Sequence, residues 1–133
     1  MIKLLSPVAA IMALTTSLVT AAELTLPDGT TTVTHVFTLK DAERIVATSH
    51  GNEIRFNRDF KGKEFHDVLV LDTIWAGLVG GYDVNFNEGI HCHIDEVGAK
   101  KLIDWDPGKR VKVTGTINTT LLGIIDLRGC EFE

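Results

Sequence analysis

Apolar and polar residues follow β-strand patterns along most of the chain after residue 63. Residues 65–75 carry apolar side chains on both faces, which indicates a strand that is buried or that coils so each half faces the core in turn. Four later stretches alternate between apolar and polar positions, as half-buried strands do. These stretches are residues 82–87, 90–94, 111–117 and 125–132. The pattern therefore predicts five strands.

Two helices are predicted from the residues at their ends. Residues 39–50 repeat apolar positions at helical spacing, Thr38 is a suitable N-cap, and Asp41 places negative charge in the first turn. Gly51 is expected to end this helix. Asp95 is a suitable N-cap for a second, shorter helix between the third and fourth strands.

Three strands, a short helix and two strands follow one another in the order of the OB-fold. We therefore predict an all-β protein, a five-stranded OB-fold Greek-key barrel with an N-terminal helix and short helices. The barrel domain is expected over residues 39–133. An extended segment, residues 23–38, precedes it and contains a turn signal at 27–29. Such a β-prone segment can supply an edge strand or pair with a partner.

The first 22 residues have the organisation of a cleavable signal peptide. Lys3 supplies the positive start, residues 8–19 are mostly apolar, and cleavage is expected after Ala21 or Ala22. The apolar run is shorter than the roughly 20 residues that span a bilayer, so we expect no membrane anchor. The cleavage point carries no cysteine for a lipid anchor. The sequence thus predicts a periplasmic or secreted protein.

An exported chain with two cysteines is expected to form one disulfide, here between Cys92 and Cys130. The third and fifth strands of an OB-fold are neighbours, so the predicted topology places both cysteines on adjacent strands. Gly129 is expected to bulge the last strand and keep Cys130 inward. A redox or metal role for the thiols is disfavoured because the chain has no C-x-x-C motif.

A polar face is predicted on the second and third strands, where OB-folds commonly bind ligands. Side chains alternate across a strand, so Cys92 points away from both neighbouring histidines and cannot share an ion with them. The candidate ligand-face residues are Asp83, Asn85, Asn87, His91 and His93.

The pair His91 and His93 also raises a metal hypothesis. Two histidines on one strand face can bind one ion, but they make only half a site. A third ligand could come from Asp83, Asn85 or His66. Unlinked surface histidines are the more common case, and the same pair could instead change its charge in mildly acidic surroundings.

The charge of the chain argues against nucleic acid as a partner. The net charge is −5, or −6 once Lys3 leaves with the signal peptide, and the basic clusters are short. Tyr82 and Phe86 are expected on the inward phase, which leaves no aromatic platform on the polar face. A protein partner or an envelope glycan suits this face better. Trp75 and Trp105 are expected to cap the barrel end, or alternatively to stack on a sugar.

No catalytic motif is present in the sequence. It has no G-x-S-x-G and no H-E-x-x-H, and His66 and Asp67 point to opposite strand faces. We therefore predict a binding or adaptor domain, not an enzyme, and expect no cofactor.

Four stretches of the chain resemble the tRNA_anti-like OB-fold family of exported bacterial proteins. They match its approach to the first strand, its third-strand cysteine, its fourth strand and its closing strand. In order they are residues 52–63, 90–92, 107–117 and 127–132. The family is named for its likeness to an anticodon-binding fold, so the resemblance implies the fold and export but no particular activity.

Overall fold

The computed structural model describes residues 21–25 and 31–133. The first 20 residues of the predicted signal peptide and the turn signal at 27–29 lie outside the described residues. Among the residues that are described, no helix is long and apolar enough to cross a membrane.

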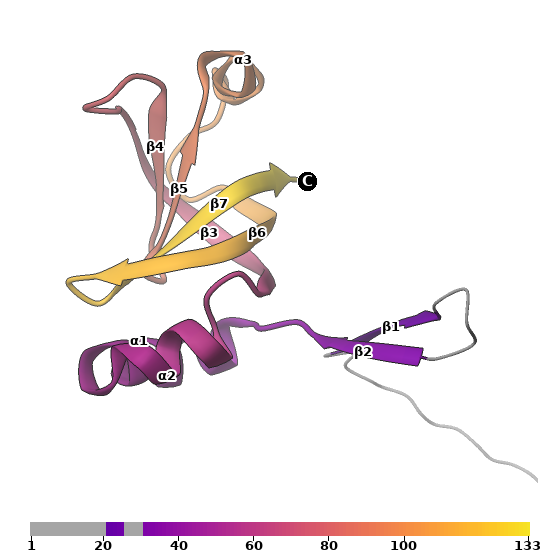
Figure 1. Cartoon of the computed structure of the whole chain (residues 1–133). Coiled ribbons are helices and arrows are strands. Elements are labelled where there is room, and N and C mark those ends of the chain that lie inside the picture. Colours follow the sequence, from indigo (N-terminus) through magenta and orange to yellow (C-terminus); the bar gives the residue numbers. More distant parts are fainter. Residues whose placement is uncertain (1–20, 26–30) are drawn as a thin grey trace, which may run out of the picture.

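Five strands form a closed barrel, which confirms the predicted OB-fold architecture (Figure 1). They are β3 (Glu64–Ala76), β4 (Tyr82–Phe86), β5 (Ile90–Ile94), β6 (Arg110–Leu121) and β7 (Ile124–Phe132). Their order around the barrel is β3-β4-β5-β7-β6. β5 and β7 run parallel, whereas the other neighbours are antiparallel.

The pairing of the long strand β3 explains why apolar residues occur on both of its faces. Its first half, up to Val70, pairs with β6, and its second half, from Leu71, pairs with β4. The register shifts between Leu71 and Thr73, which is a β-bulge. A bulge bends the strand and increases its twist, so each half turns a different set of side chains to the core.

The core fills the barrel with side chains from the inward phase of every strand. The alternating pattern predicted this phase, because residues two apart on a strand share a face. Fully or nearly fully buried examples are Phe65, Leu69, Val84, Cys92, Val113, Ile117 and Leu127.

A disulfide joins Cys92 on β5 to Cys130 on β7, as predicted, with their Cα atoms 6.2 Å apart. Gly129 has a φ of +61°, in the region that glycine adopts readily. The register between β6 and β7 also shifts between Thr114 and Thr116. Between these two pairs β7 has one residue more than β6, so the predicted bulge at Gly129 is present, and it brings the Cys130 side chain toward β5.

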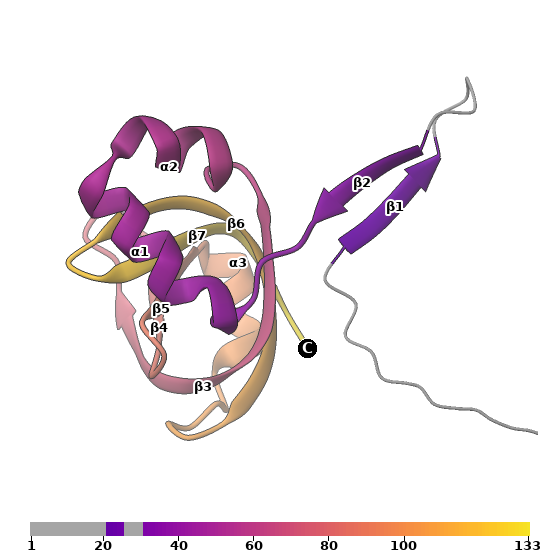
Figure 2. The same cartoon turned by 90° about the horizontal axis from the view of Figure 1, so that it is seen from below.

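Helices cover one end of the barrel (Figures 1 and 2). A 3-10 turn (η1, Leu39–Asp41) leads into α1 (Ala42–Gly51), and a further helix, α2 (Glu53–Asp59), follows directly. Thr38 caps η1 as predicted, since its hydroxyl accepts from Lys40 N and its own N–H donates to Asp41 Oδ2.

The second N-terminal helix was not predicted. The prediction ended helical structure at Gly51, but Asn52 starts a new helix because its side chain accepts from Arg55 N. α2 is held by Phe56 and Phe60, which are buried beside Ile45 of α1. The Phe60 ring also packs edge-on against Phe37, with centroids 5.1 Å apart.

A short helical stretch, α3 (Glu96–Ala99) and η2 (Lys100–Leu102), lies at the opposite end of the barrel (Figure 1). Asp95 caps it as predicted, accepting from Gly98 N at 2.7 Å. Leu102 is buried, and Trp105 packs edge-on against Phe132 with ring centroids 5.4 Å apart.

The segment predicted as extended contains a hairpin that stands off the barrel (Figures 1 and 2). Its strands β1 (Ala21–Thr25) and β2 (Thr31–His35) pair antiparallel. Phe37 then joins the hairpin to the barrel, because it is buried and its N–H donates to Glu64 O.

Candidate functional site

Four side chains from three strands form a continuous polar strip on the outside of the barrel. Asp83 and His93 are register partners on β4 and β5, and His91 and Asp126 are register partners on β5 and β7. Directly opposed residues share a face, so all four side chains point outward together. We call Asp126, His91, Asp83 and His93 the polar strip.

Hydrogen-bond distances link the polar strip from end to end. Asp83 Oδ1 lies 2.8 Å from His93 Nδ1 and 3.2 Å from His91 Nε2. The other ring nitrogen of His91, Nδ1, lies 2.7 Å from Asp126 Oδ1. Asn118 on β6 donates from Nδ2 to Asp126 Oδ2 at 2.9 Å. Together with Asn118, the strip thus links four strands of the barrel by their outer side chains.

His91 lies between two carboxylates, so the number of N–H groups on its ring decides how many of these carboxylates it can donate to. A neutral imidazole has one N–H donor, so it can satisfy either Asp83 or Asp126 but not both. Both contacts are filled when the ring carries two protons. The guanidinium of Arg128 adds positive charge nearby, with Nε 3.8 Å from Asp126 Oδ2.

The electrostatics of Asp83 follow from these contacts. The hydrogen bond from His93 lowers the pKa of the Asp83 carboxyl below its ordinary value, and partial burial opposes this effect. His91 lowers the same pKa further by its charge and its hydrogen bond. Asp83 therefore remains ionised into more acidic conditions than a free aspartate would.

Two glycines of the β3–β4 loop hold the His93 ring. A Cβ atom built on Gly81 would clash with Ile94 O and lie 3.0 Å from His93 Nε2. One built on Gly77 would lie 2.5 Å from Gly80 O and 3.0 Å from His93 Cε1. Real Cβ contacts are rarely that short. The absence of side chains at these two positions thus makes room for the ring against the loop backbone.

Three of the five predicted ligand-face residues lie together in the structure. Asp83, His91 and His93 meet in the polar strip. Asn85 lies on the same face but bonds to Thr73 Oγ1 at 3.4 Å. Asn87 lies beyond β4, where its backbone N–H donates to Val70 O.

Asp126 and Asn118 were missed from the sequence. The signal that could have found Asp126 is its polar side chain on the outward phase between Ile125 and Leu127. Its use depends on the parallel pairing of β5 with β7, which aligns it with His91.

The metal hypothesis gains no further ligands. No three His, Cys, Asp or Glu side chains within residues 21–25 and 31–133 are arranged to hold a metal ion. His66, one proposed third ligand, instead lies 2.7 Å from Thr114 Oγ1 on the β3–β6 side. Both rings of the polar strip have carboxylate partners, so a role for His91 and His93 in metal binding stays a prediction.

Trp75 lies on the same face as the polar strip, which corrects the expectation of a face without aromatic residues. It is the register partner of Asp83 and is 63% exposed. Trp75 therefore does not cap the barrel end as expected. Trp105, in contrast, is half-buried against Phe132 and does so.

Two loop tips with exposed aliphatic side chains lie at the ends of the polar strip. The β3–β4 tip carries Leu78 and Val79, next to the glycines that hold His93. The β6–β7 tip carries Leu121 and Leu122. Both tips project to the same side of the barrel in Figure 1.

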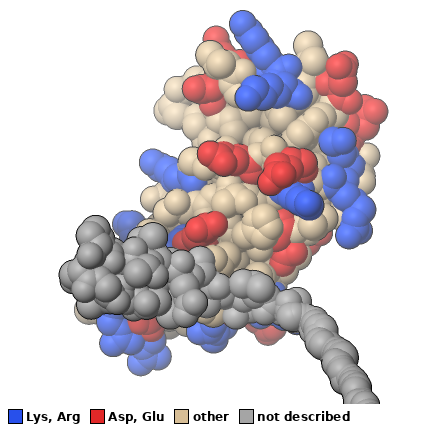
Figure 3. Space-filling model, turned by 90° about the vertical axis from the view of Figure 1, so that its right-hand side faces the viewer, with Lys and Arg blue, Asp and Glu red and all other residues tan. Residues whose placement is uncertain are grey.

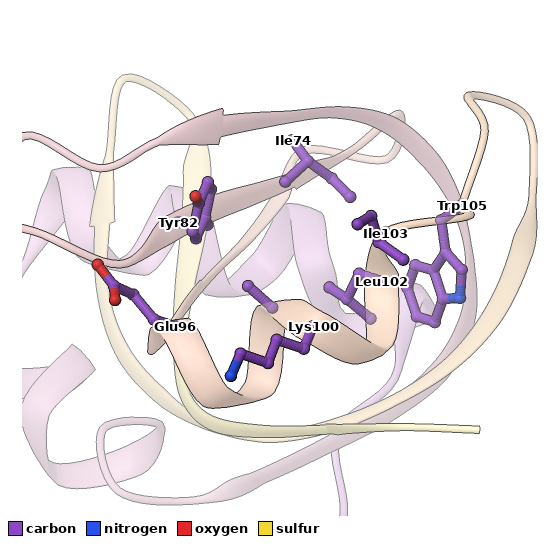
Figure 4. Close-up of a pocket in the computed structure, with 8 residues that line it drawn as sticks. Ile74, Tyr82, Glu96, Lys100, Leu102, Ile103 and Trp105 are labelled. Carbon is purple, nitrogen blue, oxygen red and sulfur yellow. The ribbon is translucent and has the colours of Figure 1, made fainter.

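A groove of about 500 Å³ lies between the α3–η2 stretch and the ends of β3 and β4 (Figure 4). Its lining residues are Ile74, Tyr82, Glu96, Ala99, Lys100, Leu102, Ile103 and Trp105. Tyr82 was expected inside the barrel. It sits on the inward phase of β4 but at the barrel end, where it is 38% exposed and forms part of the groove wall.

The surface charge is mixed on the side of the molecule in Figure 3. Where the side chains are visible there, Lys and Arg groups lie among Asp and Glu groups over the barrel. A nucleic-acid footprint would gather positive charge along one face. This side of the molecule carries no such gathering in its visible, described part.

Comparison with known proteins defines the class of the fold. A crystal structure of a lipoprotein from Klebsiella pneumoniae, provisionally named as nucleic acid-binding, has a similar fold with a TM-score of 0.53 and 12% sequence identity. The similarity covers 75% of this chain and 92% of that protein. No family model and no curated protein matches the chain. The chain is thus an OB-fold-like barrel, and a likeness at this identity establishes the fold alone.

Proposed function

We propose that this chain is an exported OB-fold binding domain that meets a protein partner through the polar strip and its two flanking loop tips. The observation that carries the proposal is the pair of exposed aliphatic tips, Leu78–Val79 and Leu121–Leu122, at either end of a hydrogen-bonded polar strip. Apolar side chains beside a central aromatic residue are typical of protein interfaces. Trp75 supplies that aromatic residue.

The charge of this surface also favours a protein over a nucleic acid. The polar strip contains two carboxylates, and the guanidinium near it, Arg128, already lies beside Asp126. Phosphate groups would meet negative charge at Asp83 and Asp126. A protein can match mixed charge and exposed aliphatic groups at the same time.

Export is supported by the disulfide and by the signal peptide that the sequence predicts. The resemblance to the tRNA_anti-like family of exported proteins points the same way, and we propose membership in that family. A periplasmic or secreted domain without a membrane anchor is therefore our proposal for its location. We also propose a binding role rather than an enzymatic one.

Single-stranded nucleic acid is a second candidate ligand because of the name given to the Klebsiella lipoprotein. Trp75 offers one exposed ring on which a base could stack. This candidate predicts that a fluorescent thymidine oligonucleotide binds, that affinity falls steeply with salt, and that Trp75→Ala abolishes binding. Flat titrations at low salt would eliminate it.

Site-specific photo-crosslinking in cells that naturally produce the protein tests the main proposal. A photoreactive amino acid is placed at Leu78 or at Leu122, and as a control at Arg58, an exposed position on α2 that belongs to neither tip. We expect the same crosslinked protein from both tips and not from Arg58. A Trp75→Ala change should reduce its yield about tenfold. Equal yield from all three positions, or none from the tips, would contradict the proposal.

A further inference from the structure

Beyond the disulfide, strand β7 has a neighbouring strand on one side only. The ladder between β5 and β7 ends at Cys92 and Leu127, whereas β7 stays paired with β6 as far as Phe132. Glu133 exchanges two backbone hydrogen bonds with Lys112 of β6. Backbone groups alternate in direction along a strand, so the N–H and C=O of Phe132 point away from β6. Among the described residues, the end of β7 therefore presents an unpaired strand edge, which we call the open edge.

A hollow of about 390 Å³ lies beside the open edge. It is bordered by the end of β5, the α3–η2 stretch and the end of β7. Beneath it Ile94 and Leu102 are buried, whereas Lys101 and Glu131 are exposed. The full lining is Ile94, Gly98, Lys101, Leu102, Trp105, Cys130, Glu131 and Phe132. The open edge thus faces a hollow and not another described element of the chain.

The first half of β3 also has β6 on one side only, but its other side is covered. There the strand exchanges backbone hydrogen bonds with Phe37. The Asp67 carboxylate accepts from the Val68 N–H at 2.7 Å, and the Glu88 carboxylate accepts from the Val70 N–H at 3.0 Å. Side chains that occupy backbone donors in this way keep other strands from pairing there. The end of β7 has no such cover from any described residue.

The hairpin at the start of the described chain has unpaired edges as well. Among the described strands, β1 and β2 pair only with each other, and such a hairpin is marginally stable in water by itself. β2, Thr31–His35, contains none of the Lys, Asp, Glu or Pro residues that keep edge strands from pairing, and its Thr and Val residues favour β-structure. The predicted cleavage after Ala21 or Ala22 leaves β2 complete.

We propose that β2 of one chain adds to the open edge of β7 in a second copy of this chain, and that the two copies exchange these strands reciprocally as a dimer. Backbone hydrogen bonds would then complete both edges. The hairpin and the end of β7 lie on the same side of the barrel (Figures 1 and 2), so one face of each copy carries both halves of the contact, as a two-fold dimer requires. This interface uses no residue of the polar strip and goes beyond the protein-binding proposal.

A chain cannot place its own β2 on its own open edge. The ring of His35, at the end of β2, packs edge-on against Phe37 with centroids 4.5 Å apart, and Phe37 is bonded to β3. β3, β6 and β7 lie between Phe37 and the open edge, and β4 and β5 lie between them the other way around the barrel. Three strands occupy on the order of 15 Å. Two residues of extended chain span only about 7 Å. The acceptor must therefore belong to another molecule.

The chemistry of this face favours a copy of the chain over other partners. Figure 3 views the side that carries the hairpin, and its visible, described part mixes Lys and Arg with Asp and Glu. A face of one sign would repel a copy of itself, whereas a mixed face does not. Nucleic acids and glycans have no peptide backbone with which to extend a ladder. A strand from a different protein would leave β2 without a partner.

Sedimentation equilibrium of the purified, oxidised protein tests for the dimer. We expect the mass to rise from monomer to dimer between about 1 μM and about 1 mM. Val33→Pro removes a backbone N–H from β2 and should weaken the dimer at least about tenfold. Lys101→Trp places a large ring at the hollow and should weaken it as well. Lys100→Trp is the matched control, because this exposed neighbour does not line the hollow, and it should leave the dimer unchanged.

Photo-crosslinking identifies the residues that meet. A photoreactive amino acid replaces Val33 in isotope-labelled protein, which is mixed with unlabelled wild type so that links between chains can be told from links within one. We expect links to residues 128–133 or 98–105 of the unlabelled chain. Circular dichroism and urea unfolding confirm that each variant keeps the barrel.

Several outcomes would overturn the strand exchange. They are a monomer at every concentration, a dimer that either Val33→Pro or Lys101→Trp leaves intact, a dimer that Lys100→Trp weakens equally, and links confined to one chain or to the loop tips. Capture of a different protein from Leu78 and Leu122 does not depend on any of these results.

Discussion

The disulfide of Cys92 and Cys130 joins β5 and β7 just beyond the point where their backbone pairing stops. The parallel ladder between these strands consists of three register pairs and ends at Cys92 and Leu127. Cys130 comes three residues after Leu127, beyond the bulge at Gly129. A covalent bond therefore continues an otherwise short contact between the strands that close the barrel.

Removal of this bond should cost much of the stability of the domain. The bond closes a loop with a sequence separation of 38 residues. In the chain-entropy model a loop of that size contributes about 4 kcal/mol to the free energy of unfolding. We expect the double variant Cys92→Ala/Cys130→Ala to unfold at clearly lower urea concentration, and reduced wild-type protein to match it. An unchanged midpoint for both samples would show that the bond does not stabilise the fold.

Gly115 allows β6 to pass close to the disulfide. A Cβ atom at this position would lie 3.1 Å from Cys130 Sγ and 3.1 Å from Leu127 Cβ. We expect Gly115→Ala to lower the free energy of unfolding by about 1–3 kcal/mol through overpacking. Gly51→Ala is the matched control, because nothing lies within 4 Å of its added Cβ. Equal urea midpoints for the two variants would contradict the close approach.

Asp83 should make stability depend on pH on the acid side. Its pKa is lowered in the folded protein, first by the His93 hydrogen bond, so it contributes stability above its unfolded pKa and loses it as the pH falls through the folded value. Since Asp83 is partly exposed, we expect Asp83→Asn to cost no more than about 1 kcal/mol at pH 7. That difference should shrink below about pH 4.

Urea unfolding of wild type and Asp83→Asn across this pH range measures the effect. Asp72→Asn is a suitable control, since Asp72 is an exposed carboxylate on β3 that has no hydrogen bond or ion pair with any described residue. If the Asp83→Asn difference stays constant down to pH 3, the lowered pKa is not linked to folding.

The capping box at Thr38 should contribute measurably to the N-terminal helices. Its hydroxyl accepts from Lys40 N at 3.3 Å, and its N–H donates to Asp41 Oδ2 at 2.9 Å. Thr38→Ala removes the hydroxyl and should cost about 1 kcal/mol, whereas Thr38→Ser keeps it and should cost less. Thermal unfolding followed by circular dichroism compares the two. Equal losses would assign the effect to packing of the methyl group instead.

The strands, and which side chains of each strand point inward, could be predicted because packing against the core requires apolar and polar residues to alternate. Cys92 and Val84 are buried while His91 and Asp83 face outward, as their positions in alternating stretches require. The disulfide was predicted separately, from two cysteines in a chain expected to be exported, and the predicted phase and topology agreed with it. These features depend on local pattern and on one known order of strands.

Features that depend on exact register could not be predicted. Asp126 meets His91 only because β5 and β7 pair in one of several possible parallel registers. The bulge at Leu71–Thr73 in β3 sets which way Trp75 points, and no residue there marks the bulge. Helix α2 was missed because Phe56 and Phe60 alone mark its buried face, while Ile54 is exposed.

The β3–β4 loop has two positions that only glycine fits and a solvent-exposed tip between them, and this has a consequence for engineering. A side chain at Gly77 would clash with Gly80 O and one at Gly81 with Ile94 O, and both would press on His93, but Leu78 and Val79 between them are open to solvent. Foreign peptide sequences inserted between Leu78 and Val79 should therefore be displayed on the barrel without disturbing it.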